Sequence, residues 1–465
     1  MTRDAQGAAV PRGWRAPLAA VVLIVLFIPI KRYTLPSALP INLEIYRIAV
    51  ALVLFLWVSA LLVDPRVRLR ASRLDAPLLL FVLAIPLSLL ANLHRASPLR
   101  GDVLKAVSFF LSYVVLFYLV VSVVRRSRDI DFLARLLAAG GAVLGVCALV
   151  EAGSGYNVFN HLHTVMPFLH SGGQVSDLYR GGGRRAYASA QHPIAMGAAF
   201  AVLLPFAVYR AAAFHQRRWW LAAALIAFGV LATRSRTPIV MLGVEVIVYA
   251  VLRTREMKRV WPAFVAIFLA AYIALPGSVS AVKDAFFPAG GLVAQQTYDH
   301  VGSGRLATLG PALVREFAPN PVLGEGFGTR ITTPDPVVRV PNGPILDDQW
   351  LGVLLETGLL GTVFLAWFFV RSVRRFGAAA KRDLSPRGWL LTAAAASVAA
   401  YAVGMFLYDA FAFAQVTFLL LIVLGLGASA VFSPAEEWAP EALRHRRGRP
   451  APAALRLAPA RGQLA

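Results

Sequence analysis

The chain has 465 residues, of which 58% are hydrophobic and 15% are charged. A soluble domain has roughly 25% charged residues, so this composition excludes an ordinary water-soluble globule. The formal net charge is +22, which in a soluble protein would suggest a nucleic-acid partner. The positions of the basic residues favour another explanation, given below, and we expect no nucleic-acid role. The single cysteine excludes an internal disulfide and a cysteine-based zinc site.

Apolar stretches long enough to cross a hydrocarbon core, about 17 to 25 residues, recur along most of the chain. They predict an all-α polytopic integral membrane protein with about twelve transmembrane helices. The first stretch follows three arginines and is short enough to resemble a secretory signal peptide, but no convincing cleavage site follows, so we expect it to be retained. The predicted spans are residues 17–30, 43–63, 76–93, 103–124, 132–152, 192–214, 218–233, 237–252, 260–276, 349–370, 388–407 and 412–432.

Lysine and arginine residues set the predicted orientation, because they are retained in short cytoplasmic loops. With the N-terminus inside, 29 of the 46 basic residues lie in cytoplasmic stretches and 14 in outer loops. Both termini are therefore predicted to be cytoplasmic, with anionic lipids as partners of the basic loops. The predicted domains are a tail of residues 1–16, a transmembrane domain of residues 17–432 and a basic, disordered tail of residues 433–465.

Two predicted outer loops, residues 153–191 and residues 277–347, are longer than a connection needs, and long loops are usually functional. The second loop lies immediately before the third-last span. Within it, apolar residues from Leu306 to Phe317 recur at helical spacing, with Ser303 as N-cap. This pattern predicts an amphipathic helix at the outer interface or, equally, part of a small packed subdomain.

Two arginines in a short outer turn violate the basic-inside pattern. Arg234 and Arg236 lie in the motif Thr233-Arg-Ser-Arg-Thr237, between the seventh and eighth spans. Planar guanidinium groups suit bidentate binding of phosphate, so this turn is a predicted phosphate site. The alternative is a pair of arginines that binds lipid headgroups.

A glycine-rich stretch before the sixth span has a similar character. Gly181-Gly-Gly183 is followed by Arg184 and Arg185, which places backbone donors beside positive charge. His192 follows at the membrane boundary, where a histidine is as often structural as catalytic. We therefore predict anion binding for the arginines and leave both roles open for the histidine.

The long outer loop contains a further set of candidate residues. Arg305 adds another positive charge on the outer side, and the glycines at 324 and 326 allow a ligand to approach the backbone or allow tight packing. Asp347 and Asp348 lie where the tenth span begins. Carboxylates at such a position are either general bases or helix-start charges favoured by the macrodipole.

Several other polar residues have structural interpretations. Glu356 lies about two turns into the tenth span, and for Glu356, as for Asp348, we favour a structural role. Glu245 in the eighth span, and Glu44 with Arg47 in the second, are predicted to be buried interhelical partners. A third ligand at usable spacing is missing for the histidine pair His161 and His163, so no metal site is predicted.

The order of these motifs resembles the O-antigen ligase and polymerase family of bacterial surface-polysaccharide enzymes. The resemblance implies about twelve helices, cytoplasmic termini and a large outer loop before the third-last helix. It also implies a metal-independent glycosyltransferase of the bacterial cytoplasmic membrane that needs no cofactor and takes a glycan from an undecaprenyl-diphosphate carrier. The motifs are Arg185…His192-Pro193, Arg234-Ser-Arg236, Ser303-Gly-Arg305, Pro321-x-Leu-Gly-x-Gly-Phe-Gly328 and Leu351…Glu356-x-Gly-Leu-Leu-Gly361.

One departure from the family pattern concerns the base. Many ligase-type members have His-Asn nine residues before the glutamate of the last motif, and Asp347-Asp348 occupies that position here. The missing histidine puts ligation onto lipid A in doubt. It favours a polymerase-like member or a ligase that uses a carboxylate as base.

The predicted reaction uses the outer arginines to stabilise a departing diphosphate and Asp347 to take the proton from the attacking sugar hydroxyl. Asp347 and Arg305 are thus the predicted catalytic residues. The acceptor would be a glycan, a lipid or a protein, and a flippase and a chain-length regulator are possible protein partners. The predicted substrate-binding residues are Arg184, Arg185, His192, Arg234, Arg236, Gly324, Gly326, Asp348 and Glu356.

Two other classes of function remain open at this point. A transporter or flippase for a lipid-linked or anionic solute would be favoured by paired broken helices at the midplane and by charges on both membrane faces. A structural or sensor protein would use the outer loop as a ligand domain and would show no turnover.

Overall fold

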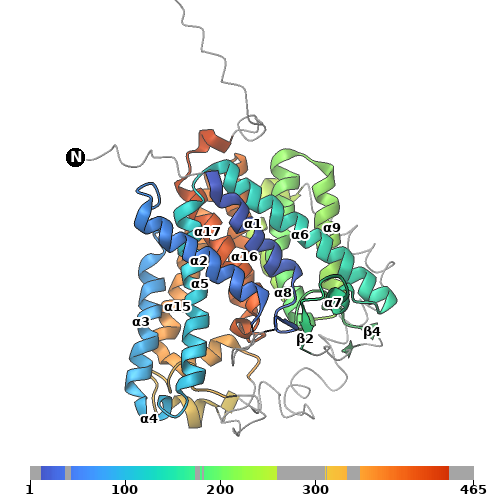
Figure 1. The fold of residues 1–465 in the computed structure, drawn as a ribbon. Coiled ribbons are helices and arrows are strands. Elements are labelled where there is room, and N and C mark those ends of the chain that lie inside the picture. The colour runs from blue at the N-terminus through green and yellow to red at the C-terminus, as the bar shows by residue number, and fades with distance from the viewer. Residues whose placement is uncertain are drawn as a thin grey trace, which may run out of the picture.

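The computed structural model describes residues 12–36, 43–172, 178–180, 183–258, 309–310, 312–331 and 346–438. Within these residues the chain forms one helical bundle in which successive long helices alternate in direction over residues 15–252 and again over residues 349–432 (Figure 1). The long helices are α1 (Arg15–Phe27), α2 (Ile45–Val63), α3 (Asp75–Ala91), α5 (Arg100–Val123), α6 (Ser127–Ser154), α8 (Pro193–Phe214), α9 (Arg217–Ala232), α10 (Arg236–Leu252), α15 (Gln349–Lys381), α16 (Pro386–Gly404) and α17 (Ala414–Phe432).

Short elements stiffen the connections between these helices. Strand β1 (Tyr33–Thr34) pairs antiparallel with β2 (His170–Ser171), and β3 (Tyr179–Arg180) pairs antiparallel with β4 (Gly183–Arg184). The short helices are η1 (Arg12–Trp14), α4 (Leu93–Ala96), η2 (Val158–His161), α7 (Leu162–Val165), η3 (Leu313–Phe317), η4 (Ala410–Ala412) and η5 (Ala435–Trp438).

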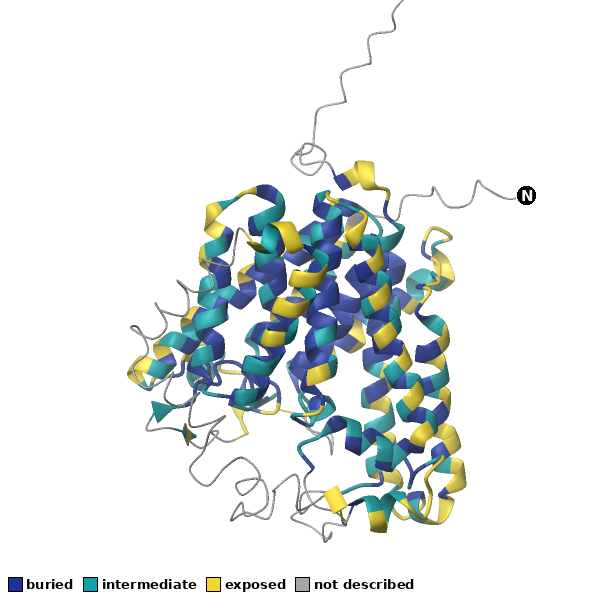
Figure 2. Ribbon diagram, turned by 180° about the vertical axis from the view of Figure 1, so that it is seen from behind, coloured by how far each residue is buried: buried dark blue, intermediate teal, exposed yellow. Residues whose placement is uncertain are grey.

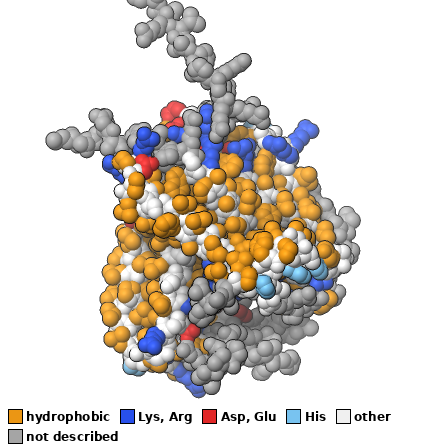
Figure 3. Space-filling model, viewed as in Figure 1, with side chains coloured by type: hydrophobic (Ala, Val, Ile, Leu, Met, Phe, Trp, Pro, Cys, Tyr) orange, Lys and Arg blue, Asp and Glu red, His pale blue; other side chains and the backbone are white. Residues whose placement is uncertain are grey.

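The alternating directions collect the loops at two ends of the bundle. At one end, which we call the basic end, α1 begins and α17 ends, and lysine and arginine side chains gather above a broad apolar band (Figure 3). The other end, which we call the site end, carries α4, α7 and both strand pairs, and lies at the bottom of Figure 1. The predicted outer loops belong to the site end wherever the structure describes them.

The helices support a multi-pass membrane protein. Six of the described helices are long and apolar enough to cross a bilayer, and α1 and α3 are shorter apolar helices. Eleven of the twelve predicted spans coincide with described long helices, while the span at 260–276 lies outside the described residues. The total number of crossings stays a prediction.

The centre of the bundle is formed by α8, α16 and α17, whose residues are almost all buried, whereas the outer helices expose apolar side chains (Figure 2). Small residues allow these helices to approach closely, as is usual in membranes. Gly425 of α17 lies against Val120 of α5, and Gly145 of α6 lies against a backbone carbonyl of α9. Helix α1 packs inside the bundle, where Gln415 Nε2 donates to the carbonyls of Val25 and Leu26.

Helix α15 is longer than the sequence indicates. Residues 371–387 were expected to form a basic cytoplasmic loop, but the helix continues to Lys381. It continues because this stretch is amphipathic: Phe376 and Ala380 are fully buried, and the Phe376 ring packs on Gly427 of α17. The arginines of the same stretch lie on the opposite face of the helix.

A break at Gly358 divides α15 into two halves. Gly358 has φ 65° and ψ −167°, a conformation that is essentially restricted to glycine. The break frees backbone groups that must find partners inside an apolar bundle. A Cβ atom at Gly358 would overlap the carbonyl of Val322, so the break and the segment that meets it need glycine here.

The segment 321–326 supplies the missing partners. Leu359 N donates to Pro321 O (2.9 Å) and Leu360 N to Val322 O (3.1 Å). In the other direction, Glu325 N donates to Leu355 O (2.8 Å) and Gly326 N to Glu356 O (3.1 Å). Ser88 of α3 adds a hydrogen bond to the same Glu356 carbonyl (2.5 Å). The loop therefore completes the hydrogen bonding of a broken membrane helix.

We expect Gly358→Ala to destabilise the protein by about 1–3 kcal/mol, because alanine is strained at this φ and ψ and its Cβ displaces the 321–326 segment. The measurement is the thermal midpoint of the purified protein in detergent. Gly243→Ala is the matched control, since Gly243 lies in α10 with open space around it. Equal midpoints for the two variants would show that the break tolerates a side chain.

Candidate functional site

Five arginines gather where the β3–β4 hairpin meets the turn between α9 and α10. Arg234 lies in this turn with φ 47°, and its Nη1 donates to Arg180 O of the hairpin (3.2 Å). A Cβ atom on Gly183 would overlap the Arg234 guanidinium, so the glycine makes room for it. We call this group the arginine cluster; its members are Arg180, Arg184, Arg185, Arg234 and Arg236.

Arg185 is buried and holds the α9–α10 turn. Its Nε donates to Thr233 O (3.3 Å) and its Nη2 to Ser235 Oγ (2.8 Å). Burial lowers the pKa of Arg185 to about 10, with a smaller effect from Arg180. The guanidinium still carries its charge at neutral pH, and its contacts fix the turn that presents Arg234 and Arg236. Arg185 is therefore a positioning residue for its neighbours.

Buried polar side chains from α6 and from the α1–α2 loop support the hairpin. Glu151 Oε2 accepts hydrogen bonds from the backbone of Tyr187 (3.2 Å) and Ala188 (2.8 Å). Arg32 Nη1 donates to Ala188 O (2.7 Å), and its guanidinium lies over the Tyr187 ring at 5.1 Å. These contacts hold the backbone next to the arginine cluster in one conformation, because buried polar groups bind their partners tightly.

His192 caps helix α8. Its Nδ1 accepts the Ile194 backbone N–H (3.1 Å), and its ring stacks on Phe413 with centroids 6.0 Å apart. Burial, followed by the charges of Arg185 and Arg180, lowers the pKa of His192 to about 4. The imidazole is then neutral at pH 7 and is a weak base. The contacts favour the structural role that the sequence analysis left open.

The carboxylates at the start of α15 have distinct surroundings. Asp348 is the N-cap, and its Oδ1 accepts the Leu351 N–H (3.0 Å). Asp347 precedes it with φ 48°, in the left-handed region. Gln349 anchors both to the α16–α17 loop, because its N donates to Met405 O (2.8 Å) and its Oε1 accepts from Phe411 N (2.7 Å).

Asp409 in the α16–α17 loop is a site residue that the sequence analysis missed. Burial raises the pKa of its carboxyl to about 6, and the neighbouring Asp347 raises it further, against the opposing effects of Lys31 and Arg330. The carboxylate also accepts the Ala412 N–H. Two carboxylates, one lysine and one arginine are thus close enough to influence one another.

The α16–α17 loop lies between the arginine cluster and these carboxylates. Ala412 O accepts hydrogen bonds from Gln191 Nε2 (3.1 Å) and from Lys31 Nζ (3.4 Å). Phe413 at the end of the same loop stacks on His192, and Asp409 at its start faces Asp347. One short loop therefore joins regions that are more than 150 residues apart in sequence.

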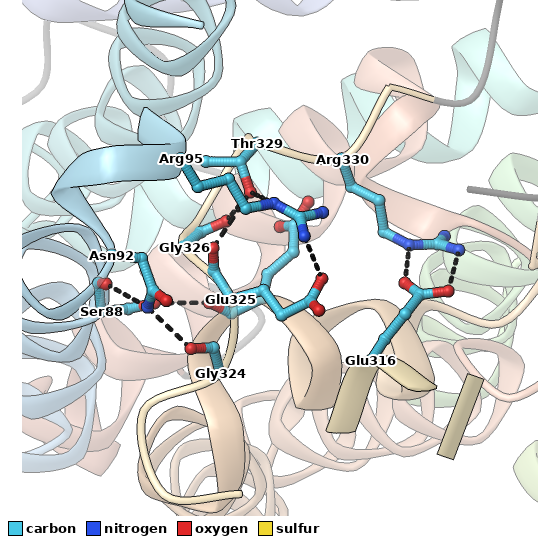
Figure 4. Close-up of polar contacts among 10 residues, drawn as sticks. Ser88, Asn92, Arg95, Glu316, Gly324, Glu325, Gly326, Thr329 and Arg330 are labelled. Atoms are coloured by element: carbon cyan, nitrogen blue, oxygen red, sulfur yellow. Dashed lines mark hydrogen bonds and ion pairs between the residues drawn. The ribbon is translucent and has the colours of Figure 1, made fainter. Parts of the chain in front are cut away.

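Two ion pairs order the loop of residues 313–331 (Figure 4). Arg330 binds Glu316 through two nitrogens, at 2.7 and 3.2 Å. Arg95 of α4 binds Glu325 at 2.8 Å, and its Nε donates to Thr329 Oγ1 (3.1 Å). Both arginines sit on the site end, and the sequence analysis counted them as outer charges without assigning them a role.

Glu356 lies next to these two ion pairs. Its carboxylate accepts the Gly328 N–H and lies near the charges of Arg95, Arg330 and Asp409. Its neighbours Gly324 and Gly326 lie against the break in α15, where a Cβ at Gly324 would overlap the backbone of residues 355–358. These contacts favour tight packing, the second of the two roles considered for the glycines.

The remaining predictions have mixed outcomes. Glu44 pairs with Arg47 (3.0 Å) on its own helix, whereas within the described residues Glu245 is buried with no ion-pair partner.

Leu313 and Phe317 pack against the first turns of α15, as expected of a packed subdomain. Arg305 and most of the 277–347 loop lie outside the described residues. Within the described residues no cluster of three metal-ligating side chains occurs.

We expect Asp409→Asn to stabilise the protein at pH 7.5 and to lose this advantage as the pH falls towards 5. A raised pKa means that folding favours the protonated carboxyl, so the wild-type protein gains stability on acidification and the amide does not. Thermal midpoints across this pH range measure the difference. Asp64→Asn, at a turn on the basic end, is the control; if it shows the same pH-dependent gap, the effect does not come from the site.

We expect His192→Asn to retain the thermal midpoint and His192→Ala to lose about 1 kcal/mol of stability, because asparagine also caps a helix. The thermal midpoints of the purified variants measure the difference. Equal midpoints for the asparagine and alanine variants would contradict a capping role for the imidazole.

Comparison with known proteins bears on this site directly. Residues 221–366 match the family model of the O-antigen ligases. The matched stretch includes the α9–α10 turn with Arg234 and Arg236, the 321–326 segment, Asp347 and Glu356. No curated protein matches the chain. Residues 221–366, at the centre of the site, are therefore similar to the O-antigen ligases.

Proposed function

We propose that the protein transfers or polymerises an oligosaccharide from an undecaprenyl-diphosphate carrier. The family supplies the coarser statement, a membrane polysaccharide ligase or polymerase with a lipid-linked donor and a glycan acceptor. The observation that carries the finer proposal is the meeting of the arginine cluster and the Asp347–Asp409 pair at the α16–α17 loop. Such a transfer needs a site that binds the diphosphate and a group that accepts a proton.

The donor diphosphate binds to the arginine cluster in this proposal. Arg234 and Arg236 flank the α9–α10 turn, and Arg236 is the first residue of α10, where backbone N–H groups also favour an anion. Planar guanidinium groups bind phosphate oxygens in pairs. They also stabilise the charge that develops as the diphosphate departs, so the arginines can do the work that a metal ion does in other transferases.

The carboxylates activate the acceptor. Asp347 takes the proton of the acceptor hydroxyl as its oxygen bonds to the anomeric carbon of the donor sugar. The bond from that carbon to the phosphate oxygen breaks, and undecaprenyl diphosphate leaves with the electron pair. The nearby Asp409 favours proton uptake at the pair, because two adjacent carboxylates resist double ionisation. A direct displacement of this kind inverts the anomeric centre.

Polymerase and ligase share this donor chemistry and differ in the acceptor. A polymerase passes the glycan to another carrier-linked chain, and a ligase passes it to a lipid or protein anchor. The carboxylate base at Asp347 favours the polymerase or a carboxylate-dependent ligase. A flippase that delivers the donor and a regulator of chain length would be its partners.

The proposed orientation places the site end on the outer face of the bacterial inner membrane and both termini in the cytoplasm. The support is the excess of arginine and lysine at the basic end. The donor diphosphate then lies at the level of the outer headgroups, beside the arginine cluster.

We expect purified protein in lipid, given a synthetic undecaprenyl-diphosphate oligosaccharide, to form product without added metal. Arg234→Gln with Arg236→Gln should lower the rate by roughly 10²–10³, and Asp347→Asn by roughly 10²–10⁴, since they remove anion stabilisation and the base. The readout is product on a gel: a ladder identifies a polymerase and a single transfer to an added anchor identifies a ligase.

The control variant is Arg217→Gln, an exposed arginine at the basic end, which should keep the full rate. Wild-type activity in the Arg234/Arg236 and Asp347 variants would contradict the assigned roles. Movement of the lipid across liposomes with no product would instead identify a transporter.

A sharper test concerns Asp409. Asp409→Asn should remove the change in rate that the wild type shows near pH 6, because the carboxyl of Asp409 has a pKa of about 6 and an amide does not titrate. The matched change Asp348→Asn keeps the helix cap and should leave this change in rate in place. A pH–rate profile of Asp409→Asn equal to that of the wild type would separate this residue from the reaction.

A further inference from the structure

Ion pairs neutralise some of the arginines at the basic end. Arg15 pairs with Asp129, and Arg210 pairs with Asp131 at 2.6 Å. Arg387 lies 3.3 Å from Asp383. In each of these pairs a carboxylate supplies the counter-charge.

One group of arginines differs. It comes from the α2–α3 loop, the α5–α6 turn and the last turns of α15, and within the described residues none of its members forms an ion pair. We call this group the arginine patch; its members are Arg68, Arg70, Arg73, Arg125, Arg371 and Arg375.

Contacts with a ring and with backbone carbonyls hold the patch together. The guanidinium groups of Arg70 and Arg73 lie over the same Phe432 ring, at 4.6 and 5.2 Å from its centroid. Arg371 Nε donates to Arg73 O (2.8 Å), and Arg125 Nη2 donates to Arg68 O (3.2 Å). Carbonyls orient these side chains but do not neutralise their charge.

The charges in the patch act on one another. Burial lowers the pKa of Arg70, and the neighbouring Arg125 lowers it further; burial and Arg68 do the same to Arg125. Arg375 lies near the charges of Arg73 and Arg371, and its buried Nε has no hydrogen-bond partner within the described residues. Arginine keeps its proton under these conditions, so the positive charges of the patch repel one another. An anion from outside the protein would reduce this repulsion.

The carboxylate of Asp75, two residues after Arg73, is already occupied by other donors. It accepts hydrogen bonds from Ser72 N (3.0 Å), Ser72 Oγ (2.8 Å) and Arg73 N (3.0 Å), and from the Tyr118 hydroxyl (3.1 Å). These contacts order the start of α3 and use the lone pairs of the carboxylate. Asp75 therefore offers no bidentate contact to a guanidinium of the patch.

Exposed apolar side chains border the patch on the side of α2. Leu62 and Val63, the last residues of α2, are 82% and 83% exposed, and Leu69 within the loop is 66% exposed. An amphiphile could place its acyl chains against these side chains and its headgroup against the arginines. A soluble anion has no acyl chain that could contact these apolar side chains.

We propose that the arginine patch binds a membrane phospholipid that carries two phosphate groups, of the cardiolipin type. Six positive side chains, two of them over one ring, exceed what a single phosphate neutralises, and the apolar border fits acyl chains. The site lies at the opposite end of the bundle from the arginine cluster, and it is independent of the transferase reaction.

The test is a thermal-shift titration of the purified full chain in a mild detergent. Four additives are compared: cardiolipin, phosphatidylglycerol, phosphatidylcholine and inorganic pyrophosphate. We expect saturable stabilisation by cardiolipin, a weaker effect of phosphatidylglycerol, and none from phosphatidylcholine. Arg70→Gln with Arg73→Gln and Arg375→Gln should weaken the cardiolipin midpoint by roughly 100-fold.

A matched control removes the same charge from the same end of the bundle, at Arg217→Gln, Arg218→Gln and Arg255→Gln. It should keep the wild-type cardiolipin midpoint. Equal weakening in the control and the patch variant would overturn the site, because it would show general electrostatic binding. Stabilisation by pyrophosphate at the same concentrations would overturn the lipid assignment.

Phe432→Leu is a second variant, in case the triple variant does not fold. It leaves all six charges in place and removes the ring that gathers Arg70 and Arg73. We expect a cardiolipin midpoint weaker than that of the wild type, with unchanged weak binding of phosphatidylglycerol. A cardiolipin midpoint equal to that of the wild type would contradict the proposed geometry.

Discussion

Inside an apolar bundle every backbone N–H and C=O needs a partner, and helix α15 violates this rule at Gly358 unless another segment intervenes. The segment 321–326 does so with four backbone hydrogen bonds to residues 355–360. These four hydrogen bonds bring the loop of residues 313–331 to α15, close to Asp409. They also explain the glycine at 324, where a Cβ atom would overlap the backbone of residues 355–358; Gly326 and Gly328 have positive φ as well.

The site end is organised in the same manner, by buried polar groups that join distant loops. Arg185 ties the hairpin to the α9–α10 turn, Gln349 ties α15 to the α16–α17 loop, and Ala412 O receives donors from two further loops. Such contacts fix charged side chains before a substrate arrives. In the proposed reaction, electrostatic stabilisation of the departing diphosphate would depend on this preorganisation, since the arginines need not be reoriented.

The two ends of the bundle hold their charges differently. At the site end, arginines outside the arginine cluster lie beside carboxylates, as Arg330 does beside Glu316, and Asp347, Asp409 and Lys31 form a mixed group. At the basic end, the arginine patch has carbonyls and an aromatic ring in place of carboxylates. The first arrangement suits a reaction in which charge and protons move, and the second suits a static anion.

The sequence by itself determined the class of protein and the position of nearly all the described helices, and it showed a resemblance to the O-antigen ligase and polymerase family, because apolar length and short motifs are local properties. It also singled out Arg234, Arg236 and Asp347 as candidates, since they break local rules of charge placement. Tertiary structure alone decided which of these residues meet. Asp409, Arg330 and Arg95 look ordinary in the sequence, and they acquire importance only because the α16–α17 loop, the 313–331 loop and α4 come together. The break at Gly358 could not be predicted from the sequence for the same reason. A glycine inside an apolar helix does not indicate a break, because the break is stable only when a distant segment supplies hydrogen-bond partners.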